Sequence, residues 1–227
     1  MDSHVVIAID GPAASGKSSV ARALARRLGL KYVNTGAMYR AVTWHAVTSG
    51  IAAADAAQVL ALLTSSRIVC GLDGNDSTIT INDFDPSDHL CDEEVNRSVS
   101  QIASIPEVRR QLVDLQRAYS AEHDLVMEGR DIGSAVFPDT PYKFYIDASP
   151  EIRAQRRARQ GLMDAISARD RQDSTRRTSP LIIAEDAHVI DSSNLTVDGV
   201  VGEIIGRLKI AGLVIEDCTS KLLPPRS

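Results

Sequence analysis

A glycine-rich run at residues 11–18 constrains the fold of this chain more than any other feature of the sequence. The run fits the pattern G-x-x-x-x-G-K-[ST] at every fixed position, and an apolar stretch at residues 5–9 lies directly before it. In such a loop, backbone N–H groups can curl around a phosphate, Lys17 adds a charge for the outer phosphates, and the Ser18 hydroxyl can ligate Mg²⁺. The motif predicts a strand, a phosphate-binding loop and a helix in that order, with a nucleoside triphosphate as ligand. A plain glycine-rich turn would not explain the Lys-Ser pair.

Beyond the loop, short β-branched runs alternate with helical patterns along the chain. The runs predict strands at residues 5–10, 31–34, 125–127, 142–146 and 188–190. The helical patterns predict helices at residues 20–28, 37–47, 55–63, 92–105, 106–121, 150–159 and 196–210. Because alternating strands and helices are typical of a parallel sheet covered on both faces, we expect a three-layer α/β/α core.

One segment departs from this alternation. Two strand-like runs at residues 67–72 and 77–81 are joined by the sequence D-G-N-D, which contains a strong turn dipeptide. The acidic residues there lack the ligand spacing of a calcium loop, and turn chemistry explains them. The segment therefore predicts a small antiparallel hairpin inserted in the α/β chain.

Composition narrows the classes of protein that this chain can represent. Its 227 residues suffice for one substantial core with insertions, and its net charge of -5 argues against a dedicated nucleic-acid surface. The three cysteines are too widely spaced for a disulfide framework or a zinc site. No apolar run approaches the ~20 residues of a membrane span, and the N-terminus lacks the basic start of a signal peptide. We therefore expect a cytoplasmic protein with neither a nucleic-acid nor a membrane partner.

Polar residues directly follow the predicted strands of the sheet. They are Asp10, Asn34, Glu128, Asp147 and Asp191. Ligands of open parallel sheets bind outside the carboxyl ends of the strands. We therefore expect the functional site at this polar edge.

Two arginine-containing elements fit phosphoryl transfer, which needs positioned cations around the transferring group and a clamp on the acceptor. Arg130, beside Asp131 at a strand end, can hold an acceptor phosphate, although a structural Arg-Asp pair is the alternative. The arginines of residues 153–177 outnumber the acidic residues there. This excess favours a mobile cover over the phosphates, although a solvated helix face is the alternative.

Several motifs together resemble those of the bacterial cytidylate kinases, a family of the nucleoside monophosphate kinase group. They are I-D-G-P-A-A-S-G-K-S at residues 9–18, N-T-G-A-M-Y-R at 34–40, E-G-R-D-I-G at 128–133, V-F-P-D at 136–139, R-D at 169–170, D-S-T-R at 173–176 and S-P-L at 179–181. The motifs span most of the chain in the same order as in the family. The resemblance implies transfer of the γ-phosphoryl group of ATP to CMP or dCMP, with Mg²⁺, to give the diphosphate and ADP.

The resemblance also implies roles for individual residues. The ATP-binding residues would be Gly11, Pro12, Ala13, Ala14, Ser15, Gly16, Lys17, Ser18, Ser19 and Arg157. The acceptor-binding residues would be Thr35, Tyr39, Arg40, Ser100, Arg109, Arg130, Asp131, Arg169, Asp173 and Arg176. Within the acceptor-binding set, Thr35, Arg40 and Arg130 would grip the phosphate. Ser100, Arg109 and Asp131 would read the cytosine edge, and Arg169 with Asp173 would reach the sugar. Lys17, Arg130 and Arg176 would be catalytic, Ser18 would ligate the metal, and the arginines of residues 153–157 would close over the phosphates.

The resemblance further implies one P-loop kinase domain at residues 1–217, with a frayed tail at 218–227. A monophosphate-binding insert would cover about residues 36–122 and a short lid about 153–177. Glu128 stands where many members have Asp, and it keeps the carboxylate. We expect a monomer that binds ATP and CMP or dCMP.

A GTPase-type switch and a nucleotide-binding regulator without turnover are the competing functional classes. A GTPase would select guanine through an Asn-Lys-x-Asp element, and none of the five lysines follows an asparagine. ATP consumption only in the presence of CMP would exclude both classes.

Overall fold

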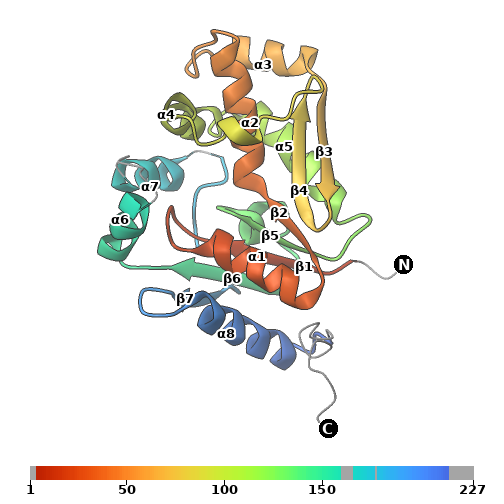
Figure 1. Ribbon diagram of the computed structural model, residues 1–227, viewed down its shortest axis with the longest axis vertical. Helices are drawn as coiled ribbons and strands as arrows, with labels where there is room; N and C mark the ends of the chain where they lie inside the picture. The colour runs from red at the N-terminus through yellow and green to blue at the C-terminus, as the bar shows by residue number, and fades with distance from the viewer. Residues whose placement is uncertain (1–3, 160–165, 177, 215–227) are drawn as a thin grey trace.

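One sheet organises the chain, which a computed structural model describes at residues 4–159, 166–176 and 178–214 (Figure 1). Within these residues its seven strands follow the order β3-β4-β2-β5-β1-β6-β7. They are β1 (Val6–Asp10), β2 (Lys31–Asn34), β3 (Ile68–Asp73), β4 (Asp76–Ile81), β5 (Leu125–Gly129), β6 (Tyr142–Asp147) and β7 (His188–Asp191). The strands β2, β5, β1, β6 and β7 pair in parallel, which confirms the predicted α/β class.

Helices connect most of these strands. They are α1 (Lys17–Leu28), α2 (Thr35–Thr48), α3 (Ala56–Ser65), α4 (Glu93–Ile102), α5 (Pro106–Tyr119), α6 (Pro150–Arg159), α7 (Ile166–Thr175) and α8 (Val197–Ile210). A short 3-10 helix, η1 (Ser87–His89), and a π-helix, η2 (Ile132–Val136), complete the described elements. Helix α2 begins two residues before the predicted start at residue 37, because the Asn34 side chain caps it by accepting a hydrogen bond from the Ala37 N–H at 3.1 Å.

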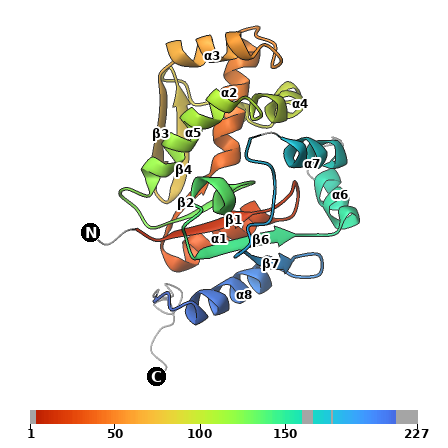
Figure 2. The same cartoon turned by 180° about the vertical axis from the view of Figure 1, so that it is seen from behind.

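The central strand β1 shows how the three layers pack. Its side chains Ile7 and Ile9 are fully buried against α1 and α8 on one face of the sheet (Figure 1). Val6 and Ala8 point to the opposite face, where they pack with residues of η2 and α5. Figure 2 shows the molecule from behind, with α5 labelled. Successive strand residues alternate between faces, so a strand covered on both sides must be apolar throughout, as the run before Asp10 is.

The predicted hairpin is present and lies at the edge of the main sheet. Strands β3 and β4 pair in antiparallel fashion over their full length. Strand β4 meets β2 at a single parallel bridge between Tyr32 and Asp76, and Tyr32 N donates to Asn75 O at 2.7 Å. Its buried residues Ile79 and Ile81 join a core made mainly by α2, α3, α4 and α5. The hairpin therefore supports α2, which leads from the sheet edge into the upper part of the molecule in Figure 1.

Besides the short η1, two described elements were not predicted from the sequence. Helix α7 has polar residues around most of its circumference, so no apolar period announces it. The π-helix η2 follows β5 after Asp131 and is held by main-chain contacts described below. Both elements lie beside the predicted site.

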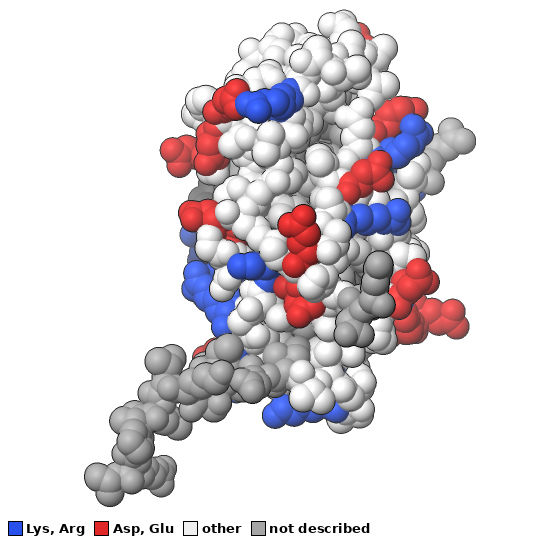
Figure 3. All heavy atoms as spheres, turned by 90° about the vertical axis from the view of Figure 1, so that its right-hand side faces the viewer, with Lys and Arg blue, Asp and Glu red and all other residues white. Residues whose placement is uncertain are grey.

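The molecular surface carries charged side chains of both signs (Figure 3). On the face shown in Figure 3, acidic and basic side chains are interspersed. Among the described residues, no helix combines the length and the apolar character needed to cross a membrane.

The burial of α8 against the sheet gives a matched test of the core. Ile204 is fully buried in the core of α1, α8 and the sheet, whereas Ile210 of the same helix is 81% exposed. We expect Ile204→Ala to lower the free energy of unfolding by about 2–5 kcal/mol, because it leaves a cavity in the core. Ile210→Ala should change it by less than about 0.5 kcal/mol. Urea denaturation of both variants measures the difference, and equal effects would contradict this packing of α8.

Candidate active site

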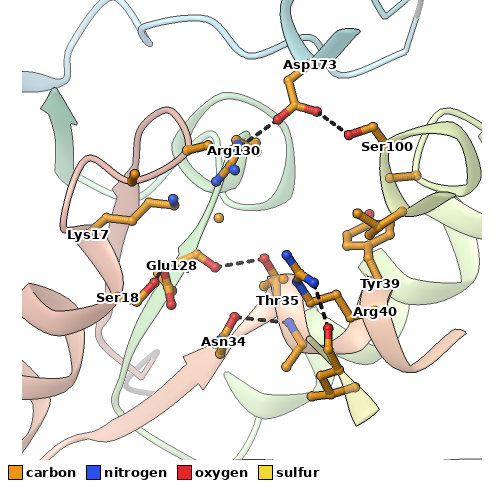
Figure 4. A pocket seen from close by; sticks show the side chains of 18 of the residues that line it. Lys17, Ser18, Asn34, Thr35, Tyr39, Arg40, Ser100, Glu128, Arg130 and Asp173 are labelled. Carbon is orange, nitrogen blue, oxygen red and sulfur yellow. Dashed lines mark hydrogen bonds and ion pairs between the residues drawn. The ribbon is translucent and has the colours of Figure 1, made fainter. Parts of the chain in front are cut away.

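A cavity of about 680 Å³ opens at the carboxyl ends of the parallel strands (Figure 4). The predicted site residues that line it are Ala13, Ala14, Gly16, Lys17, Ser18, Ser19, Asn34, Thr35, Tyr39, Arg40, Ser100, Arg109, Glu128, Arg130, Asp131, Arg156, Arg157, Arg159, Asp173 and Arg176. Gly11, Pro12 and Ser15 complete the phosphate loop. The side chain of Arg169 lies outside the described part of the chain. The fold thus brings together predicted residues that are up to 163 positions apart along the chain, from Ala13 to Arg176.

The phosphate loop owes its shape to glycines at both ends. A Cβ on Gly11 would lie 2.1 Å from the Ile146 carbonyl oxygen, so no other residue fits there. Gly16 has φ 91° and forms the N-terminal cap of α1, which begins at Lys17. The Lys17 ammonium donates to Pro12 O at 3.1 Å and is buried. A helix N-terminus with unpaired N–H groups and an adjacent lysine is suited to bind a phosphate.

Glu128 organises the polar groups next to the loop. Ser18 Oγ donates to Glu128 Oε2 at 2.8 Å, and Tyr32 OH donates to Glu128 Oε1 at 2.6 Å. Thr35 Oγ1 donates to the Glu128 carbonyl at 2.7 Å, as Figure 4 shows. Hydroxyl and carboxylate oxygens are the ligands that Mg²⁺ prefers. The described residues contain no cluster of three acidic, histidine or cysteine side chains that could hold a metal alone, and Mg²⁺ in nucleotide sites needs only one or two protein ligands.

Asp173 holds two arginines across the cavity from the loop. Its carboxylate accepts from Arg130 Nε at 2.8 Å and pairs with Arg176, three residues later and just after the end of α7. Ser100 Oγ lies 3.5 Å from the second carboxylate oxygen (Figure 4). Burial alone would raise the pKa of Asp173, but the charges of Arg130 and Arg176 outweigh it and hold the pKa below its usual range. Asp173 therefore stays ionised and keeps both guanidinium groups at the cavity wall.

A second buried ion pair joins Arg109 to Asp131. The two side chains are 3% and 7% exposed, and Arg109 Nη1 also donates to Ala103 O at 3.3 Å. The Arg109 guanidinium lies over the Tyr39 ring, 5.4 Å from its centroid. A charged pair that is almost dry at a cavity wall presents fixed donors and acceptors, which is the arrangement needed to recognise the polar edge of a base.

Asn96 was not predicted as a site residue, yet it meets two predicted arginines. Arg40 Nη1 donates to Asn96 Oδ1 at 2.8 Å and to Leu90 O at 2.6 Å. Arg157 Nη2 lies 3.5 Å from the same Asn96 oxygen. An acceptor-side arginine and a lid arginine thus converge on one amide, and no sequence motif marked Asn96 for this position.

Other cavity residues were also missed. They are Gly36, Ala37, Ser87, Leu90, Cys91, Val99, Ala103, Gly129 and Val197. Gly129 ends a strand and could have been inferred from that position, whereas Ser87, Leu90 and Cys91 come from η1 and the turn after it. Cys91 is an exposed, free cysteine.

Asp10 links the start of the phosphate loop to the acceptor side. Its two carboxylate oxygens accept from Ile132 N at 2.8 Å and Gly133 N at 2.7 Å, at the start of η2. Burial raises the pKa of Asp10 to about 7, against the lowering effects of the two N–H groups and Lys17. The Asp10 carboxyl group fixes η2 to the end of β1. It thereby also fixes Arg130 and Asp131, the two residues before η2.

The parallel sheet, the phosphate loop and the ring of arginines define a P-loop phosphotransferase. The protein-family model described as Cytidylate kinase matches residues 7–210 of the chain. The cytidylate kinase of Streptomyces avermitilis is 43% identical over 206 residues, which cover 87% of this chain and 89% of that protein. The cytidylate kinase of Corynebacterium glutamicum is 44% identical over 213 residues, which cover 88% of this chain and 93% of that protein. The chain belongs to the cytidylate kinase family, which confirms the resemblance found in its motifs.

Among solved structures, a gluconokinase from Sinorhizobium meliloti matches with a TM-score of 0.49 and 13% identity over 92% of this chain and 93% of that chain. The family assignment depends on the sequence matches.

The raised pKa of Asp10 predicts a pH dependence of stability. Between about pH 4 and pH 7 the unfolded chain has released this proton, whereas the folded protein retains it. The contribution of Asp10 to stability is therefore full below pH 4 and falls as the pH rises through 7. Asp10→Asn should remove this contribution and make the free energy of unfolding less dependent on pH between about 4 and 7, as measured by urea denaturation at several pH values. The same slope in both proteins would contradict the assignment.

Proposed function

We propose that this protein transfers the γ-phosphoryl group of ATP to CMP or dCMP, forming ADP and CDP or dCDP. One observation carries the proposal: the phosphate loop and the acceptor-side arginines line a single cavity in a chain of the cytidylate kinase family. Phosphoryl transfer requires positioning and charge stabilisation rather than covalent help from the protein, and both are supplied by residues around this cavity.

On the donor side, the loop 11–18 would hold the phosphates of ATP through its N–H groups and the N-terminus of α1. Lys17 would stay with the transferring group and offset the charge that develops on it. Ser19 lies in the first turn of α1 and lines the same cavity, and Arg157 approaches from α6. The loop is thus placed to present the terminal phosphate to the centre of the cavity.

On the acceptor side, Arg40 and Arg130 would bind the monophosphate, with Thr35 at the start of α2 beside them. Ser100, Arg109 and Asp131 would recognise the base, and Tyr39 packs under the Arg109 guanidinium. Asp173 would reach the sugar while it holds Arg130 and Arg176. Arg169 stays a prediction, since its side chain is outside the described residues.

Mg²⁺ would be bound by the Ser18 hydroxyl and the ATP phosphates, with the Glu128 carboxylate next to it. When bound, the ion would neutralise charge on the phosphates during transfer. The protein's part is to keep Ser18 in place, and the hydrogen bond to Glu128 supports this role because it fixes the hydroxyl at the cavity wall.

The proposed domain plan remains one P-loop kinase domain over residues 1–217, with the insert at about 36–122 and the lid at about 153–177. The expected monomer and cytoplasmic location also remain predictions.

A coupled assay of ADP formation tests the substrate assignment. With Mg-ATP we expect kcat/KM for CMP or dCMP to exceed that for AMP by at least about tenfold, because a site that pairs with a polar base edge rejects a base that leaves its groups unpaired. Comparable turnover of AMP would contradict CMP or dCMP as the preferred acceptor, but not phosphoryl transfer as the class of reaction. ATP consumption without any acceptor would contradict both.

Two substitutions separate the donor and acceptor sides. Lys17→Met should lower kcat by at least about 100-fold, because it removes a charge aimed at the transferring group. Arg130→Met should raise the KM for CMP far more than the KM for ATP, because its guanidinium would bind the acceptor phosphate. Steady-state kinetics with each substrate varied measures both effects. Equal changes in the KM values for CMP and ATP in Arg130→Met would show that Arg130 does not bind the acceptor.

The metal assignment has its own test. Ser18→Ala should raise the Mg²⁺ concentration required for half-maximal activity by about tenfold at fixed ATP, because one ligand is lost. Titration of activity with Mg²⁺ measures this shift. An unchanged requirement would show that Ser18 does not ligate the ion.

A further inference from the structure

The two helices α6 and α7, here called the lid helices, contact the phosphate loop through its main chain. Arg153 Nη1 of α6 donates to Ala13 O at 3.3 Å, and Asp170 Oδ1 of α7 accepts from Ala13 N at 3.2 Å. Arg153 and Asp170 also form an ion pair with each other. Together they hold both polar main-chain groups of one loop residue.

The Arg153-Asp170 pair is itself well anchored. The two side chains are 11% and 18% exposed, so water competes little for their hydrogen bonds. Arg153 Nε donates to Ala148 O at 3.1 Å, just after β6. Charge-assisted hydrogen bonds in such a setting are stronger than those between neutral groups. The pair therefore ties the loop to the sheet as well as to the lid helices.

Arg156 makes a parallel contact one turn further along α6. Its Nη1 donates to Ser15 O and to Ser192 Oγ, both at 3.0 Å, and Ser192 Oγ donates to Ser15 O at 2.7 Å. Arg153 and Arg156 were predicted to close over the phosphates of the ligand. In the structure both donate to carbonyl groups of the phosphate loop.

The loop needs such support at the residue between these two contacts. Ala14 lies between Ala13 and Ser15 and has φ 59°. This value lies in the left-handed region, which is unfavourable for residues other than glycine. A residue persists in this region only where its surroundings determine the conformation. The contacts on either side of Ala14 come from the lid helices and from Ser192.

We propose that Arg153 and Asp170 are positioning residues that hold the phosphate loop in its ATP-binding conformation by gripping the peptide groups of Ala13. The inference deepens the proposed function and rests on it, since it assigns the loop to ATP. Preorganising the loop lowers the entropy lost when ATP binds, so the pair strengthens ATP binding without touching ATP.

The position of Asp170 on α7 also relates the two halves of the site. Asp173, three residues later on the same helix, holds Arg130 and Arg176 on the acceptor side. Loss of the Asp170 contact leaves these Asp173 contacts in place. The pair therefore affects ATP binding much more than acceptor binding.

Calorimetric titration with Mg-ATP in the absence of acceptor tests the proposal on the full chain. Asp170→Asn removes the charge that pairs with Arg153, and we expect the Kd for ATP to rise about tenfold. The KM for CMP should change by less than about threefold. Arg153→Lys keeps the charge but cannot reach Ala13, Ala148 and Asp170 together, so it should weaken ATP binding in the same direction.

Asp83→Asn is the matched control. It makes the same chemical change in an exposed ion pair with Arg67 on the hairpin, where the side chain is 76% exposed. Asp83 also has a positive φ, 67°, which asparagine tolerates. This variant should leave the Kd for ATP unchanged, and thermal unfolding of all variants shows whether each is folded.

A rescue experiment separates positioning from a general loss of stability. Ala14→Gly relieves the left-handed strain, so the loop depends less on the pair. We expect Asp170→Asn to raise the Kd for ATP about tenfold in the original background and less than threefold in the Ala14→Gly background. A merely structural role would give the same loss in both.

Three results would overturn the proposal: a change in ATP Kd of less than twofold in Asp170→Asn, a loss that persists in the Ala14→Gly background, or an equal rise in the KM for CMP. ATP binding is measured without acceptor, so the outcome stands whether or not CMP is the substrate. Failure of the proposed function would appear instead as absent turnover with CMP beside normal ATP binding.

Discussion

The active site depends on one close approach, between Gly11 and the Ile146 carbonyl oxygen. A Cβ at residue 11 would lie 2.1 Å from that oxygen. The chain can therefore turn away from β6 after β1 only because residue 11 is a glycine. The turn lets the next residues curl over the sheet edge and start α1 at Lys17. Because the N–H groups at a helix start have no partners within the helix, the loop presents donors to an anion. The rest of the cavity is arranged around this anion-binding end.

Opposite the loop, the site consists of guanidinium groups that are already paired. Arg130 and Arg176 share Asp173, and Arg109 pairs with Asp131. Arginines buried without counter-ions would be strongly destabilising, whereas pairs with hydrogen bonds are tolerated. These carboxylates therefore fix the direction of each arginine before any nucleotide binds. A phosphate bound there would meet donors that need little rearrangement, which is the condition for effective charge stabilisation during transfer.

Much of the fold could be predicted because its signals are local. The run before Asp10 is apolar at every position, as a strand buried on both faces must be, and the D-G-N-D turn marks the hairpin. Helix α7 could not be predicted, since its stability comes from contacts of Asp170 and Asp173 with distant elements rather than from an apolar stripe. The π-helix η2 likewise depends on Asp10, 122 positions earlier in the chain.

By itself, the sequence determined the phosphate loop, the parallel sheet and the family, because these follow from motifs whose residues are neighbours in the chain. Only the tertiary structure decided what each charged side chain faces. Arg153 and Arg156 were expected to bind phosphate but donate to Ala13 and Ser15, while Arg130, directly after β5, meets Asp173 on α7. The reason is physical: a charge run specifies how many cations are present, whereas the partner of each depends on which elements the sheet and its crossovers bring within hydrogen-bonding distance.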